Sequence, residues 1–203
     1  MLAGRNQYAP MAGMPELRQA IVDKVASLYG ARFDPETEVT VTAGATQAIF
    51  TAVAAFVRPG DEVVVFAPVY DSYIPAILLN GGNPVVAHLA APDYRPDFDQ
   101  LRRLLSPRTR MLIINSPHNP TGSVWSTDDM TELAALLAGT EIVVVSDEVY
   151  EHMVFDGVAH VSVMHYPALR ERSFVVSSFG KTFHITGWKI AYCLAPASLT
   201  AEL

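Results

Sequence analysis

The 203-residue sequence contains a single cysteine, Cys193, and its positive charge is sparse. One cysteine excludes an intramolecular disulfide framework and a zinc site made of several thiolates. The 14 Lys and Arg against 21 Asp and Glu leave a net charge of −7, which argues against nucleic acid as a partner because phosphate binding needs clustered cations. No apolar run approaches the roughly 20 residues of a membrane span, and from the pattern of the first residues we expect no secretory leader. We therefore expect a cytoplasmic protein without a membrane segment.

Hydrophobic residues, in contrast, make up 50% of the chain, and the mean hydropathy is +0.23. This composition excludes a disordered chain, which has too little apolar surface to offset the entropy of ordering. Seven apolar runs are predicted strands: 39–43, 62–67, 84–89, 110–115, 141–146, 173–177 and 189–194. Most are continuously apolar, which is typical of strands buried on both faces in a parallel sheet.

Helical patterns lie between these strands, at 15–29, 45–57 and 128–137. Leu17, Ile21, Val25 and Leu28 recur at helical spacing in the first of them. Strands that alternate with helices predict βαβ units and a doubly wound α/β fold. The histidines show no metal-ligand spacing, so we expect no metal site.

Three polar side chains of catalytic interest follow two of the predicted strands. Asp147 comes directly after the strand 141–146, Tyr150 follows three residues later, and Lys181 lies in a loop after the strand 173–177. Ligands of open α/β sheets bind at the carboxyl ends of the strands. A half-buried lysine can attack a carbonyl carbon, and an aspartate can pair with a pyridinium nitrogen. Taken singly, Lys181 is more often a solvated loop residue, and Asp147 is equally well a cap.

Three more strand ends carry residues suited to a flat, phosphorylated ligand. The small residues at 42–46 precede a helix, whose free N–H groups bind anions. Tyr70 offers an aromatic face and Asn119 an amide. Each has a plainer interpretation, as a βα turn, a core tyrosine and an Asn-Pro turn. In chain order, however, the strand ends supply every group that pyridoxal 5′-phosphate (PLP) requires.

Five motifs in this order closely resemble the class I/II aminotransferases of fold type I. They are Asn6-Gln-Tyr8, Thr42-Ala-Gly-Ala-Thr-Gln-Ala, Pro117-His-Asn-Pro-Thr-Gly122, Ser146-Asp-Glu-Val-Tyr150 and Ser178-Phe-Gly-Lys-Thr-Phe-His-Ile-Thr-Gly-Trp-Lys189. The resemblance covers essentially the whole chain. Within the family, the chain most resembles the branch of the methionine aminotransferases and kynurenine–oxoglutarate transaminases. It implies an aminotransferase large domain, with a seven-stranded, mostly parallel sheet flanked by helices. The run 189–194 would be the one antiparallel strand.

The resemblance also implies roles for individual residues. Lys181 would form the Schiff base with PLP and carry the proton between the substrate and the cofactor. Asp147 would pair with the pyridine nitrogen. Tyr150 and Asn119 would hydrogen-bond the phenolic oxygen of the ring, and Tyr70 would stack on it.

The phosphate would be held by the backbone amides of Ala45 and Thr46 together with Ser178 and Lys189. Lys189 stands where many aminotransferases have arginine. Tyr8 would reach the phosphate in a neighbouring subunit, which implies a homodimer with shared sites.

The two ends of the chain and the greater length of the family lead us to expect a fragment. Residues 1–196 would form the PLP-binding large domain, and residues 197–203 would begin a linker to an absent C-terminal small domain. No arginine here matches the one in that domain that grips the substrate carboxylate.

The expected reaction is transamination between an L-amino acid and a 2-oxo acid, with methionine, aromatic or other hydrophobic amino acids as substrates. Two alternatives stay open: a cysteine-S-conjugate β-lyase, and a truncated PLP-binding chain without turnover. The effector domain of a PLP-dependent transcription regulator is disfavoured, since no basic segment precedes Asn6.

Overall fold

The structure is a computed structural model and describes residues 7–203. Its seven strands form one sheet in the order β1-β7-β6-β5-β4-β2-β3. They are β1 (Val39–Thr42), β2 (Glu62–Ala67), β3 (Asn83–His88), β4 (Thr109–Asn115), β5 (Val143–Asp147), β6 (Ser173–Ser178) and β7 (Ala191–Leu194). β7 pairs antiparallel with both β1 and β6, and every other pairing is parallel. The predicted fold class and the antiparallel last strand are therefore confirmed.

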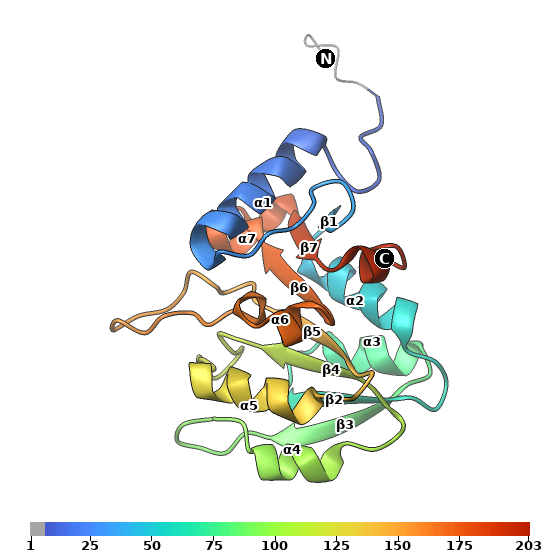
Figure 1. The fold of residues 1–203 in the computed structure, drawn as a ribbon, viewed down its shortest axis with the longest axis vertical. Coiled ribbons are helices and arrows are strands. Elements are labelled where there is room, and N and C mark those ends of the chain that lie inside the picture. Colours follow the sequence, from blue (N-terminus) through green and yellow to red (C-terminus); the bar gives the residue numbers. More distant parts are fainter. Residues whose placement is uncertain (1–6) are drawn as a thin grey trace.

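Helices cover both faces of this sheet (Figure 1). They are α1 (Pro15–Tyr29), α2 (Ala45–Phe56), α3 (Tyr73–Leu79), α4 (Phe98–Leu104), α5 (Thr127–Leu137) and the short α6 (Pro167–Arg170), α7 (Phe179–Thr182) and α8 (Ala197–Thr200). Two 3-10 turns, η1 (Val163–His165) and η2 (Thr186–Trp188), complete the elements. None of the helices within residues 7–203 has both the length and the hydropathy needed to cross a bilayer.

The continuously apolar strands are buried because each face of the sheet has its own core. In β4, Leu112 and Ile114 join the core beneath α1, α4 and α5, while Met111 and Ile113 join the core beneath α2 and α3. Because successive side chains enter one apolar core or the other, neither face of the strand is polar, and the strand sequence is continuously apolar.

Most differences from the predicted elements lie at strand boundaries. The strand expected at 189–194 begins only at Ala191, because Lys189 adopts a left-handed backbone conformation with φ of 54° that no strand accommodates. The strand expected at 141–146 runs from Val143 to Asp147 instead, which places Asp147 in the sheet. The helices α3 and α4 were not predicted, since each is only seven residues long and gives little periodic signal.

The expected domain boundary at 196/197 stays a prediction. The last residues pack against the rest of the chain, since Leu199 and Leu203 contact the apolar core beneath α2 and α3.

Candidate active site

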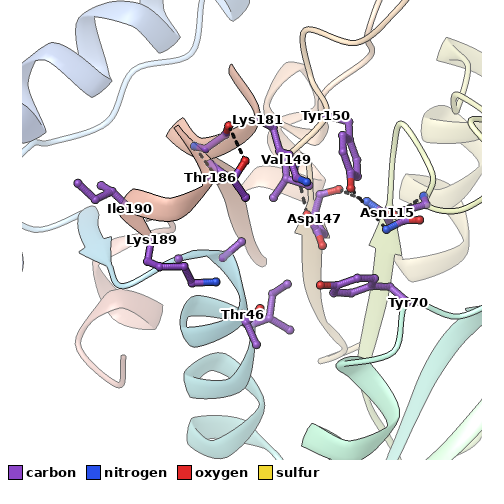
Figure 2. Close-up of a pocket in the computed structure, with 16 residues that line it drawn as sticks. Thr46, Tyr70, Asn115, Asp147, Val149, Tyr150, Lys181, Thr186, Lys189 and Ile190 are labelled. Carbon is purple, nitrogen blue, oxygen red and sulfur yellow. Dashed lines mark hydrogen bonds between the residues drawn. The ribbon is translucent and has the colours of Figure 1, made fainter. Parts of the chain in front are cut away.

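A cavity of about 260 Å³ opens at the carboxyl ends of β4, β5 and β6, beside the N-terminus of α2. Its volume lies just below the roughly 300–1,000 Å³ typical of small-molecule sites. Nine of the ten predicted site residues line it: Ala45, Thr46, Tyr70, Asn119, Asp147, Tyr150, Ser178, Lys181 and Lys189. Figure 2 shows their side chains converging from elements that are far apart in the sequence.

Asp147 lies at the base of the cavity, at the end of β5, and only 4% of it is exposed. Burial raises the pKa of this carboxyl to about 6, although the hydroxyl of Tyr73 and the backbone N–H of Val149 both donate to it and lower the pKa. The Tyr73 hydroxyl is 2.5 Å from Oδ2. Ionising Asp147 is therefore costly, and a cation placed next to it would offset that cost.

Lys181 and Tyr150 lie together on one side of the cavity. The ammonium nitrogen of Lys181 is 5.5 Å from the centre of the Tyr150 ring, which is within the range of a cation–π contact. Nδ2 of Asn119 donates to the Tyr150 hydroxyl across 3.4 Å. Burial raises the pKa of the Tyr150 phenol, and the charge of Asp147 adds to this effect.

The opposite end of the cavity favours an anion. Gly44 precedes α2 with φ of 90°, and Gly44, Ala45 and Thr46 line the cavity at the start of the helix. The first N–H groups of an α-helix have no partner within the helix. A Cβ atom on Gly44 would lie 3.5 Å from Cε and 3.7 Å from Nζ of Lys189, which places this ammonium over the same helix end. Among residues 7–203, no carboxylate forms an ion pair with Lys181 or Lys189. Helix N-terminus and cation together form a phosphate-type site.

Tyr70 and Ser178 border the same space. The Tyr70 ring packs edge-to-face on Tyr73, with ring centres 5.5 Å apart, and burial raises the pKa of its phenol. Ser178 caps the short helix α7, where its hydroxyl accepts from the N–H of Gly180 across 3.1 Å.

Tyr8 is the one predicted site residue that does not line the cavity of its own chain. It is fully exposed. Its expected role in a neighbouring subunit stays a prediction, and Asn6 of the same motif lies outside the described residues.

Two polar residues that contact predicted site residues were not predicted from the sequence. The Asn115 side chain accepts from the backbone N–H of Asn119 at 2.7 Å and donates to the carbonyl of Asp147 at 2.9 Å, so it links two predicted site residues. Its signal was its place at the end of β4, where a polar residue follows an apolar run. Tyr73, the partner of Asp147, lies three residues after Tyr70, but only the fold brings its hydroxyl to Asp147.

The histidines and acids of residues 7–203 form no cluster of three that is suited to a metal ion. His160 is paired with Glu148 at 2.8 Å, and Nδ1 of His118 lies 2.8 Å from the hydroxyl of Thr121.

Comparison with known proteins agrees with this geometry. The family described as "Aminotransferase class I and II" matches residues 2–203. The methionine aminotransferase of Escherichia coli K12 is 52% identical over 200 residues, which are 98% of this chain and 52% of that protein. Kynurenine–oxoglutarate transaminase 1 of Rattus norvegicus is 36% identical over 209 residues, 98% of this chain and 49% of that one.

A solved Escherichia coli structure, whose reactivity identified a methionine aminotransferase function, superimposes with a TM-score of 0.97 at 52% identity. The match covers 99% of this chain and 53% of that one. The chain thus spans about half the length of the curated relatives it matches. With the family match over residues 2–203 and the converging site residues, the chain belongs to the class I and II aminotransferases.

Proposed function

We propose that this protein transfers the amino group of an L-amino acid to a 2-oxo acid with PLP as cofactor. The observation that carries the proposal is the convergence of Lys181, Asp147 and Tyr150 on one cavity whose far end holds Lys189 over the α2 N-terminus. Members of this family use PLP, and the residues present fit it.

The fit rests on the chemistry of the two ends of the cavity. The α2 N–H groups of Ala45 and Thr46, the ammonium of Lys189 and the hydroxyl of Ser178 would hold the phosphate. The buried carboxyl of Asp147 would pair with the protonated ring nitrogen. Burial raises the pKa of this carboxyl, and a cation beside it would stabilise its ionised form. Tyr70 would cover one ring face.

Bound PLP supplies an electron sink that stabilises a carbanion at Cα of the amino acid. Lys181 would hold the cofactor and, once released from it, take the proton from the substrate Cα. Tyr150 and Asn119, already in contact, would hydrogen-bond the phenolic oxygen of the cofactor. Asp147 would keep the ring nitrogen protonated, because its negative charge is buried and strongly favours a cationic neighbour.

For the amino donor we propose methionine, with aromatic and other hydrophobic amino acids as further substrates. The support is the 52% identity to a methionine aminotransferase and the 36% identity to a kynurenine–oxoglutarate transaminase. We also propose a homodimer in which Tyr8 reaches the phosphate of the neighbouring site.

The experiment is a PLP titration followed by borohydride reduction and peptide mass mapping. The chain has three lysines, Lys24, Lys181 and Lys189, so the map is unambiguous. We expect a phosphopyridoxyl group on Lys181 alone. Lys181→Ala should abolish this adduct, whereas the matched Lys189→Ala should bind PLP more weakly but still carry the adduct at position 181. Labelling spread over the lysines would refute the proposed site.

Turnover is tested on the same preparation with methionine and a 2-oxo acid acceptor. Release of the 2-oxo acid with the methionine side chain intact would identify transamination. Methionine has no leaving group on Cβ, so β-elimination is tested separately with a cysteine S-conjugate. Release of its thiol together with pyruvate and ammonia would identify the β-lyase alternative.

A further inference from the structure

The segment that follows Asp147 is fixed by two buried acids that the proposed mechanism does not use. Asp147 and Tyr150 face the cavity, as Figure 2 shows, whereas Glu148 and Glu151 do not line it. Glu148 and Glu151 are 1% and 4% exposed. The two acids therefore anchor a turn whose other residues form the site.

The Glu151 carboxylate accepts hydrogen bonds from four side chains on three elements. Nζ of Lys24 in α1 lies 2.6 Å from its Oε1, and the hydroxyl of Tyr192 in β7 lies 3.4 Å from the same oxygen. The hydroxyls of Tyr29 in α1 and Ser177 in β6 also donate to the carboxylate. Burial alone would raise the pKa of Glu151, but Lys24 and the hydroxyl donors outweigh it and hold the pKa below its ordinary value.

The side chain of Tyr150, in contrast, is only weakly held by its own hydrogen bonds. Its hydroxyl has one long hydrogen bond, 3.4 Å from Asn119, and the residue is only partly buried. Its position is therefore set by the backbone of the turn. The Glu148 N–H donates to the carbonyl of Val176, and the Glu151 N–H donates back to the carbonyl of Glu148.

A buried ion pair is weak evidence for stability, because desolvation costs about as much as the attraction gains. Such pairs are better explained where they specify one arrangement of the chain. We propose that Glu151 is a positioning residue for Tyr150: its contacts with α1, β6 and β7 fix the turn so that the Tyr150 hydroxyl stays beside Asn119 and its ring stays beside Lys181. The consequence for cofactor binding rests on the proposed function, but the placement of Tyr150 does not.

The first test needs no cofactor. A 3-fluorotyrosine at position 150 reports the surroundings of that ring by fluorine NMR. We expect Glu151→Gln, which keeps the shape of the side chain but removes its charge, to shift or broaden this resonance. The matched control is Glu62→Gln, since Glu62 is also buried and paired, with Arg108, at the opposite end of the sheet. An unchanged resonance in folded Glu151→Gln protein would overturn the proposal.

The second test asks whether Glu151 acts through Tyr150. Glu151→Gln should weaken PLP affinity roughly tenfold, a typical coupling between contacting groups. In a Tyr150→Phe background the same change should have almost no further effect. Fully additive losses would show that Glu151 acts by another route. If the unaltered chain binds no PLP, the proposed function fails while the fluorine result still decides the placement.

Folding of Glu151→Gln is not essential to the test. Tyr29→Phe and Ser177→Ala each remove one donor from Glu151 and leave its pairing with Lys24 in place. Both should shift the fluorine resonance in the same direction, by less than Glu151→Gln. Unchanged resonances in both variants would also overturn the proposal.

Discussion

At the scale of a single residue, Asp147 differs from the apolar core around it because it is a buried group that can carry a charge. Its carboxyl is deprived of water but has no cationic partner among residues 7–203, so its pKa rises to about 6. In an unfolded chain the same group would have its ordinary pKa of 3.8. The ionised form of Asp147 therefore costs stability unless a cation lies beside it.

The raised pKa of Asp147 predicts a pH dependence of stability. Between about pH 4 and pH 6 the folded chain without cofactor binds more protons at position 147 than the unfolded chain. Its free energy of unfolding therefore falls as the pH rises, by about 2 kcal/mol over this range from this group. Asp147→Asn should remove this fall. Urea denaturation of both proteins across the range measures it, and a constant difference between them would contradict the raised pKa.

Glu62→Gln provides a control of opposite sign. The hydrogen bonds from Ser106 and Arg108 hold the pKa of Glu62 below its ordinary value. Its carboxylate therefore stabilises the fold above that ordinary value and loses this contribution as the pH falls. In the same denaturation series the unaltered protein should gain stability over Glu62→Gln as the pH rises.

At the scale of an element, the segment from the end of β6 to the start of β7 carries three of the predicted site residues, Ser178, Lys181 and Lys189, on very little regular structure. Gly180 is what lets this turn close on itself. A Cβ atom there would lie 3.0 Å from Cα of Thr186 and 3.3 Å from Oγ of Ser178. The contact with Thr186 is to backbone, so the turn itself would have to move.

We therefore expect Gly180→Ala to destabilise the protein by about 1–3 kcal/mol, the usual cost of overpacking, and to weaken PLP binding. Gly187→Ala is the matched control in the same turn, since no atom lies within 4 Å of its added Cβ. Its free energy of unfolding should change by less than about 0.5 kcal/mol. Equal effects of the two variants in urea denaturation and PLP titration would contradict the steric argument.

At the scale of the whole molecule, several large apolar side chains have no cover within residues 7–203. Exposed examples are Tyr8, Met11, Leu79, Phe155 and Trp188. The proposed homodimer would bring the Tyr8 of each chain to the site of its neighbour.

Tyr8→Phe tests that arrangement. Because Tyr8 is fully exposed in its own chain, the substitution should leave the free energy of unfolding of the monomer unchanged. PLP affinity should fall only at concentrations where sedimentation shows a dimer. Tyr94→Phe is the control, since that ring packs against the core beneath α4 and α5, away from the cavity. A loss of affinity in monomeric Tyr8→Phe protein would exclude the shared site.

The sequence by itself determined the class of fold, the helix Pro15–Tyr29 and nine of the sixteen residues that line the cavity. The strands and the helix are local features, because continuously apolar runs and helical spacing appear within a few positions along the chain. Polar residues directly after a strand pointed to some of the site residues, and the resemblance of five motifs to a known family supplied the rest. The strand starts at 143 and 191 were missed, because the left-handed Lys189 and the extent of pairing depend on neighbouring elements.

Only the tertiary structure decided which distant groups meet. Tyr73 reaches Asp147 across 74 positions of sequence, and Lys24 reaches Tyr192 across 168. The raised pKa of Asp147 and the hydrogen bonds of Glu151 depend on such contacts between distant residues, and no local sequence pattern predicts them. Burial and hydrogen bonding are properties of packed elements, so the chemistry of this site is fixed when the sheet and its helices close around it.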